Sequence, residues 1–194
     1  MDNTVGSLTE EQKSILIGCL LGDGTMRKKR NALLEINHSL NQKALVDWLF
    51  SKFSNLVTTK PKSRQGNGSR RAYRFTTRSL PVLTPYYDWF FRKGKKVIPH
   101  DLKLTPLTLA VWFMDDGCKS RTSIYLNTQQ FSKLEQVGLI ALLDDQFGIK
   151  STLNTDKIYL RIMIKVSSVK RFVKLVKPYI LEDFRYKFPS VMTP

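Results

Sequence analysis

LIGCLLGDG, residues 16–24, and LAVWFMDDG, residues 109–117, are the two stretches of sequence that decide the fold. Each is apolar almost throughout and ends in an aspartate followed by a glycine, Asp23-Gly24 and Asp116-Gly117. The two aspartates lie 93 positions apart. An apolar run that stops at glycine predicts a buried helix, so we expect two such helices at matching places in a duplicated chain.

The residues before each stretch predict where each helix begins. Before the first, Ser7 is expected to cap the helix and Glu10 to complete a capping box. Before the second, Thr105-Pro106 is the expected start, because proline suits the first helical turn.

The segments after the two helices follow one order. The first half has strand-like runs at 32–37, 57–64 and 72–77, helical patterns at 41–53 and 83–91, and a turn at 65–69. The second half has strand-like runs at 123–127, 150–154 and 157–164, helical patterns at 132–147 and 169–179, and a turn at 155–156. We therefore expect an α+β fold in which the order αββαββα appears twice. The two subdomains would be pseudo-symmetric, each with a curved antiparallel sheet, and would pack through the two apolar helices.

The expected division is residues 1–92 for the first repeat, 93–104 for a Lys-rich linker that contains Pro99, and 105–194 for the second repeat.

The composition indicates a folded and strongly basic protein. Of the 194 residues 42% are hydrophobic, and 32 Lys and Arg against 16 Asp and Glu leave a net charge of +16. A balance this basic indicates a polyanionic partner. No apolar run approaches the ~20 residues that cross a bilayer, so nucleic acid is favoured over a membrane. A ribosomal-type or merely soluble basic protein is the alternative that charge alone leaves open.

Cysteine and histidine usage argues against a zinc site. Cys19 and Cys118 lie in unlike settings, which predicts reduced thiols in an intracellular protein. With His38 and His100 as the only histidines, they cannot build a zinc site. The first residues show neither a secretory signal nor a transit peptide, so secretion is not expected.

An aspartate at the end of a helix needs a physical reason. The C-terminal end of a helix carries about half a negative charge, so a carboxylate there is disfavoured by several tenths of a kcal/mol. Two such ends packed side by side would gather like charges, and this is stable only with a cation or lysines between them. One Asp-Gly pair alone would be an ordinary turn, whereas two matching pairs in a basic chain indicate a metal site.

The two stretches resemble the paired motifs of the LAGLIDADG homing endonucleases, in the monomeric branch that carries both motifs in one chain. The resemblance extends over nearly the whole chain, including the Lys-Lys-Val-Ile-Pro run at 95–99 and the Tyr-Lys-Phe-Pro run at 186–189. The first motif departs from the family pattern at Cys19 and Gly22, and the second at Val111, Trp112 and Phe113. The last acid of each motif is retained.

The resemblance implies the roles of the residues around the motifs. Asp23 and Asp116 would bind Mg²⁺, for which Mn²⁺ would substitute, and the backbone carbonyls of Gly22 and Asp115 would complete the coordination. The side chain of Asp115 would be peripheral. Lys96 and Lys187 would polarise the attacking water or steady the phosphate, although a solvated loop charge is the alternative for both.

The resemblance also implies how the two motif helices pack. Small residues would allow their close approach, at Gly18 and Gly22 in the first helix and at Ala110 in the second. The bulky Trp112 and Phe113 would face the flanking core.

Cationic and polar side chains on the strands predict where duplex DNA would lie. Residues 57–78 hold seven basic residues and no acid, and residues 158–164 alternate between apolar and polar side chains. An antiparallel sheet with a polar face can enter the major groove, while clustered cations contact phosphate. A solvated strand face is the alternative for any single member. The candidates are Arg27, Lys28, Lys29, Arg30, Glu35, Asn37, Lys60, Lys62, Arg64, Arg70, Arg71, Arg74, Lys119, Arg121, Tyr125, Asn127, Gln129, Asn154, Tyr159 and Arg161.

The function that the resemblance implies is Mg²⁺-dependent cleavage of a long, asymmetric duplex DNA site by a monomer, leaving short 3′ overhangs. An RNA maturase that helps its host intron to splice is one alternative, and a non-catalytic DNA-binding regulator is another. Retention of both acids favours the nuclease. The expected location is an organelle (mitochondrion or chloroplast) or a prokaryotic cytoplasm.

Overall fold

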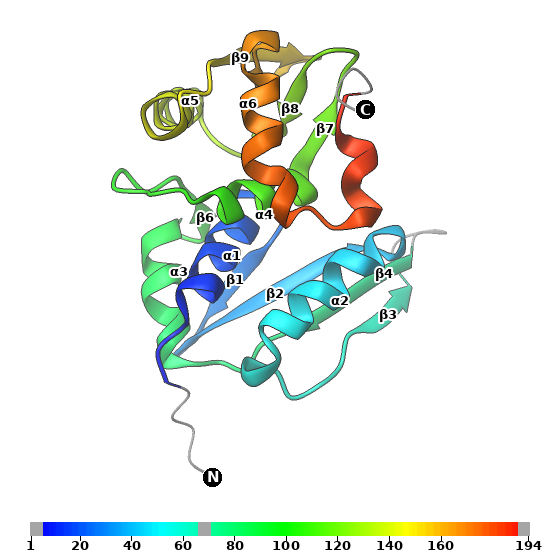
Figure 1. Ribbon diagram of the computed structural model, residues 1–194. Helices are drawn as coiled ribbons and strands as arrows, with labels where there is room; N and C mark the ends of the chain where they lie inside the picture. The colour runs from blue at the N-terminus through cyan, green and yellow to red at the C-terminus, as the bar shows by residue number, and fades with distance from the viewer. Residues whose placement is uncertain (1–5, 66–70, 190–194) are drawn as a thin grey trace.

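The computed structural model describes residues 6–65 and 71–189, and it contains the predicted order αββαββα twice (Figure 1). The first half consists of α1 (Glu10–Leu21), β1 (Thr25–Lys28), β2 (Ala32–Ser39), α2 (Lys43–Lys52), β3 (Lys62–Gln65), β4 (Arg71–Thr76) and α3 (Thr84–Phe90). The second consists of α4 (Pro106–Asp116), β7 (Gly117–Lys119), β8 (Ile124–Leu126), α5 (Lys133–Phe147), β9 (Ser151–Asp156), β10 (Tyr159–Ile164) and α6 (Val166–Val176). Single 3₁₀ turns lie at Leu40–Gln42, Ser54–Leu56, Pro81–Leu83 and Lys177–Tyr179, and a longer one at Glu182–Lys187.

Each half contains one four-stranded antiparallel sheet with the same topology. The strand order is β1-β2-β4-β3 in the first and β7-β8-β10-β9 in the second. Figure 1 shows α2 lying over the first sheet, and α5 packs against β9 and β10 of the second. The repeated order supports a pseudo-two-fold relation between the halves and confirms the α+β class.

The helices α1 and α4 pack side by side between the two halves (Figure 1). An added Cβ at Gly18 would lie 2.6 Å from Val111 Cβ and 2.8 Å from the Thr108 carbonyl oxygen. An added Cβ at Gly22 would lie 2.3 Å from Asp115 Oδ2. The predicted role of the two glycines therefore fits the geometry. In α4, however, Val111 rather than Ala110 lies opposite Gly18.

The start of α1 differs from the prediction. Thr9, not Ser7, caps the helix, and Gln12, not Glu10, completes the capping box. The side chain of Gln12 is also fixed by a hydrogen bond outside the helix, since its amide nitrogen donates to the Lys52 carbonyl at 2.9 Å and so links α1 to α2. The start of α4 agrees with the prediction, since the Thr105 side chain accepts from the Thr108 N–H and Pro106 opens the helix.

The turn between β9 and β10 lies two residues later than predicted. Asp156 pairs with Tyr159, so Lys157 and Ile158 form the turn, and Lys157 has a φ of 56°. Ile158 was expected on the apolar strand face and is instead 82% exposed. The short strands β1 and β7 had no predicted range, because neither is long enough to show a period of two. Most of the predicted turn at 65–69, and Arg70, lie outside the described residues.

A β-hairpin lies across the boundary that the sequence predicted between the first repeat and the linker. Strand β5 (Phe91–Arg92) pairs with β6 (Lys95–Lys96) around Lys93-Gly94. This pairing places Lys96 in an ordered element.

One hydrophobic core extends through both halves. Trp112 and Phe113 are fully buried, and Phe113 packs against Phe172 and Phe188 as predicted for the flanking core. Both cysteines are free thiols, as expected. In the part of the chain that the structure describes, no helix has both the length and the apolar character needed to cross a membrane.

Candidate active site

The C-terminal ends of α1 and α4 meet at one point. Gly22 caps α1, and Asp23 follows it as an exposed residue. The N–H of Asp23 donates to Asp115 Oδ2 of α4 at 2.8 Å. Asp116 is the last residue of α4 and is half-buried beside them. The two aspartate-glycine ends are therefore brought together, as the sequence predicted.

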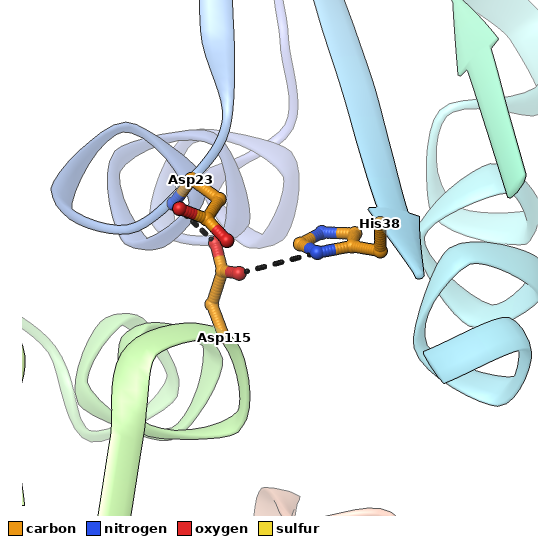
Figure 2. A group of neighbouring side chains, drawn as sticks. All are labelled: Asp23, His38 and Asp115. Atoms are coloured by element: carbon orange, nitrogen blue, oxygen red, sulfur yellow. Dashed lines mark hydrogen bonds and ion pairs between the residues drawn. The ribbon is translucent and has the colours of Figure 1, made fainter. Parts of the chain in front are cut away.

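A histidine completes this group. His38 lies on β2, on the side of the strand that also buries Leu34 and Ile36, and its Nδ1 is 3.5 Å from Asp115 Oδ1. Figure 2 shows the three side chains converging from the turn after α1, from α4 and from β2. One donor atom from each of Asp23, His38 and Asp115 lies within 4.8 Å of the other two.

The two predicted lysines contact matching backbone carbonyls. Lys96 Nζ donates to the Gly22 carbonyl at 2.6 Å. Lys187 Nζ donates to the Met114 carbonyl at 2.5 Å and to the Asp115 carbonyl at 3.3 Å. Gly22 and Asp115 each precede a motif aspartate, so each lysine lies at the same place in its own half. This geometry argues against the alternative of solvated loop charges, since Lys187 is only 7% exposed.

The crowded acids have strongly shifted pKa values. Burial, together with the nearby charge of Asp23, raises the pKa of Asp115 to about 7. Burial and the charges of Asp115 and Asp23 raise the pKa of Asp116 to about 8. Burial lowers the pKa of Lys96 and of Lys187, against the pull of these acids. The site therefore disfavours its own negative charge unless a cation offsets it.

The side chain of Asp115 was expected to be peripheral, and it is central. It is 7% exposed and contacts both Asp23 and His38. It reaches this place because its counterpart Gly22 has no side chain to occupy the space. The sequence windows align Asp115 with Gly22, but they do not show which side chain points across the helix pair.

The sequence analysis missed two residues of the site. His38 continues the alternating buried face of β2, a parity that was visible in the sequence from Leu34 and Ile36. Gln130 donates through Nε2 to the Gly22 carbonyl at 3.1 Å, across the two halves. No local pattern indicates this contact, because it depends on how the halves pack.

The donor set fits a divalent cation. Carboxylates of Asp23, Asp115 and Asp116 are the oxygen ligands that such ions prefer. Asp115 Oδ1 is buried without a hydrogen-bond partner among the described residues. Of the two carbonyls that the resemblance assigns to the metal, that of Asp115 accepts from Lys187, and that of Gly22 accepts from both Lys96 and Gln130.

The polar face of the first sheet carries most of its predicted DNA-binding residues. Asn37 pairs across the strands with Arg74, and Arg74 with Lys62. Glu35 joins this face through an ion pair with Arg27 and a longer contact, 3.8 Å, with Arg74. Lys60, Arg64 and Arg71 are exposed beside it. In the Arg27–Arg30 cluster, Lys28 is held by Asp88 at 2.6 Å, while Lys29 and Arg30 are exposed.

The polar face of the second sheet is built around a stacked pair. The guanidinium of Arg161 lies 4.0 Å from the centre of the Tyr125 ring, and Arg161 pairs across the strands with Asn154. Arg161 also lies 3.3 Å from Asp156. Tyr159, Lys119 and Arg121 are exposed near this face, and Asn127 and Gln129 follow β8 as half-buried residues.

Comparison with known proteins shows the family to which the chain belongs. The LAGLIDADG DNA endonuclease family matches residues 13–172. A probable intron-encoded endonuclease 1 of Wickerhamomyces canadensis is 32% identical, over 93% of this chain and 85% of its own length. The cytochrome b mRNA maturase bI2 of Saccharomyces cerevisiae is 31% identical over 99% of this chain, which spans only 50% of that relative.

A solved structure agrees in fold as well as in sequence. The homing endonuclease I-WcaI, bound to its DNA recognition sequence, superposes with a TM-score of 0.87 at 30% identity. The match covers 94% of this chain and 88% of that protein.

Proposed function

Because the chain belongs to the LAGLIDADG DNA endonuclease family, we propose that it is a monomeric, site-specific endonuclease that hydrolyses double-stranded DNA with Mg²⁺. Mn²⁺ is expected to substitute. The target would be long and asymmetric, because the polar faces of the two sheets carry different side chains, and cleavage would leave short 3′ overhangs. The I-WcaI complex with DNA supports duplex DNA as the substrate.

One observation carries this proposal. At the meeting point of α1 and α4, each half places a lysine on the carbonyl that precedes its motif aspartate. Two equivalent sets of charged groups, one per half, suit an enzyme that cuts two strands.

Asp23 and Asp116 would hold the metal, with the carbonyls of Gly22 and Asp115 beside them. When bound, a divalent cation supplies a water of lowered pKa and offsets charge on the phosphate. Lys96 and Lys187 would place positive charge next to the same phosphates, and because Lys187 is buried and Lys96 half-buried, water would screen that charge less.

The test begins by finding the target, through selection of cleaved sequences from a randomised duplex library. Asp23→Asn and Asp116→Asn should then each abolish double-strand cleavage of the selected duplex, while its binding in a gel-shift assay is retained. Asp145→Asn, an exposed acid on α5, is the matched control and should cut normally. The proposed metal site is wrong if both site variants still cut.

A second function is favoured by particular relatives. The bI2 maturases of Saccharomyces cerevisiae and Debaryomyces hansenii are 31% and 32% identical and align with 99% and 95% of this chain. We propose intron RNA as a possible second partner, to be tested by splicing of the host intron transcript with and without the protein. Unchanged splicing would exclude this role. The cellular compartment stays a prediction.

A further inference from the structure

The cluster of Asp23, His38 and Asp115 contains unsatisfied buried atoms. Both ring nitrogens of His38 and Oδ1 of Asp115 are buried and form no hydrogen bond in the described part of the chain, although Nδ1 and Oδ1 face each other at 3.5 Å. The His38 side chain is 1% exposed, and that of Asp115 is 3% exposed. Native proteins rarely leave several buried polar atoms without hydrogen bonds, because their lost contacts with water are then not replaced. These atoms therefore point to a ligand that the three side chains share.

The donor types indicate what that ligand is. Two carboxylate oxygens and one imidazole nitrogen lie within 4.8 Å of one another, close enough to be ligands of a single cation. Both ring nitrogens of His38 are buried, and burial favours the uncharged ring, which has a free lone pair. A neutral imidazole is the form that binds metals.

The lysines do not already fill this role. Lys96 and Lys187 direct their ammonium groups to the carbonyls of Gly22, Met114 and Asp115. Neither lysine forms an ion pair with Asp23 or Asp115 in the described residues, so the carboxylates keep free lone pairs for a metal.

Among its described residues, the second half has no equivalent of this cluster. Thr25 and Cys118 each follow their motif aspartate by two positions and pair with Glu35 and Tyr125. Glu35 and Tyr125 are therefore equivalent positions in the two halves. Three residues after Glu35 the first half has His38, and three residues after Tyr125 the second half has Thr128. Thr128 is fully buried and donates to Gln136 at 2.8 Å, so its side chain is already satisfied.

Asp115, the second carboxylate of the cluster, also has no equivalent side chain in the other half. Asp115 corresponds to Gly22, which has no side chain. The histidine and the second carboxylate are thus confined to one half of the molecule, in contrast to the paired lysines.

We propose that Asp23, His38 and Asp115 form a mixed nitrogen and oxygen metal site, present in the first half only, that binds Mn²⁺ or another divalent transition metal more tightly than Mg²⁺. An imidazole ligand favours transition metals, whereas Mg²⁺ prefers oxygen ligands alone. The inference rests on the proposed function in one respect, because Asp23 is a ligand both of the catalytic metal and of this mixed site. The site is formed by protein alone, so it is tested without DNA.

The experiment is pulsed electron paramagnetic resonance of Mn²⁺ bound to the tag-free full chain. Bound Mn²⁺ should show ¹⁴N coupling from imidazole, and Mg²⁺ should compete for it weakly. His38→Gln should remove the coupling and weaken Mn²⁺ binding about tenfold or more. His100→Gln, which changes the other histidine, in an exposed position, should leave both unchanged.

Two further variants separate this site from the cleavage chemistry. Asp115→Asn should weaken Mn²⁺ binding without changing the far-ultraviolet circular dichroism. Asp116→Asn should keep the nitrogen coupling although cleavage is lost. Wild-type protein that binds no Mn²⁺ without DNA, or binds it without nitrogen coupling, would overturn the proposal, as would coupling that survives His38→Gln. None of these outcomes depends on whether DNA is cut.

Discussion

The first and second halves of the active site share their backbone contacts and differ in their side chains. Lys96 contacts the carbonyl before Asp23 at 2.6 Å, and Lys187 contacts the carbonyl before Asp116 at 3.3 Å together with the Met114 carbonyl at 2.5 Å. Beside these contacts, however, Gly22 in one half corresponds to the buried Asp115 in the other. The reason is steric, because a Cβ at Gly22 would lie 2.3 Å from Asp115 Oδ2. Where two copies of a fold meet, one side chain fills the shared space, so only the contacts that avoid this space stay symmetric.

The strongest test of the symmetric part removes one lysine at a time. Lys96→Met and Lys187→Met keep the side-chain length and remove the charge. Each should slow cleavage about a hundredfold, the usual loss when one positioned charge near the reacting group is removed. If each lysine serves its own half, the two variants should accumulate duplexes nicked in opposite strands. Strand-specific end labels on a denaturing gel measure this, and equal slowing of both strands by either variant would show that the lysines do not work separately.

The close approach of α1 and α4 is tested by filling its glycines. Gly18→Ala places a Cβ 2.8 Å from the Thr108 carbonyl oxygen, which belongs to the backbone and cannot move alone. We expect a loss of about 3 kcal/mol in the free energy of unfolding, measured by urea denaturation. Gly22→Ala should lower the free energy of unfolding by less, because the added Cβ would clash with the side chain of Asp115 and not with backbone. Combining it with Asp115→Ala should restore the lost stability.

Gly138 is the matched control for these substitutions. It lies in α5 with nothing within 4 Å of an added Cβ, so Gly138→Ala should stabilise the protein by about 0.5–1 kcal/mol. A Gly18→Ala variant as stable as the wild type would mean that α1 and α4 are not in close contact.

The smallest expected effect is the pH dependence of the melting temperature, measured with a chelator present to keep the protein free of metal. The pKa values of Asp115 and Asp116 are raised to about 7 and about 8, from 3.8. Between pH 4 and 8 the folded state therefore binds more protons than the unfolded state, and stability falls as the pH rises. We expect the melting temperature to decrease from pH 5.5 to 8, and Asp116→Asn to reduce this decrease. A melting temperature that rises over this interval would contradict the raised pKa values.

Much of the architecture could be predicted from local patterns. The two apolar runs ending in Asp-Gly gave α1 and α4, and Pro106 marked the start of α4 because its ring restricts the backbone. The alternation of residues 158–164 predicted β10, although the turn lies at Lys157-Ile158. The capping residue of α1 was missed because Gln12 is selected by a contact with α2.

The candidate site was predictable only in part. Lys96 and Lys187 were predicted as site residues because each stands just before a short apolar run that ends in proline. His38 was set aside because the sequence argument considered only a zinc site built from cysteines and histidines, and not an imidazole beside carboxylates. Gln130 had no signal, since its contact with Gly22 crosses between the halves.

The sequence by itself determined the duplicated helix and strand order, the net charge of +16 and the placement of an aspartate at the end of each apolar helix. These follow from residue type and from periodicities that neighbouring residues show. Only the tertiary structure decided that Asp115 lies buried between Asp23 and His38, and that one half holds a cluster the other lacks. The physical reason is that residues 23, 38 and 115 meet only when α1 packs against α4. Which side chain then fills the shared space depends on Gly22 leaving it open.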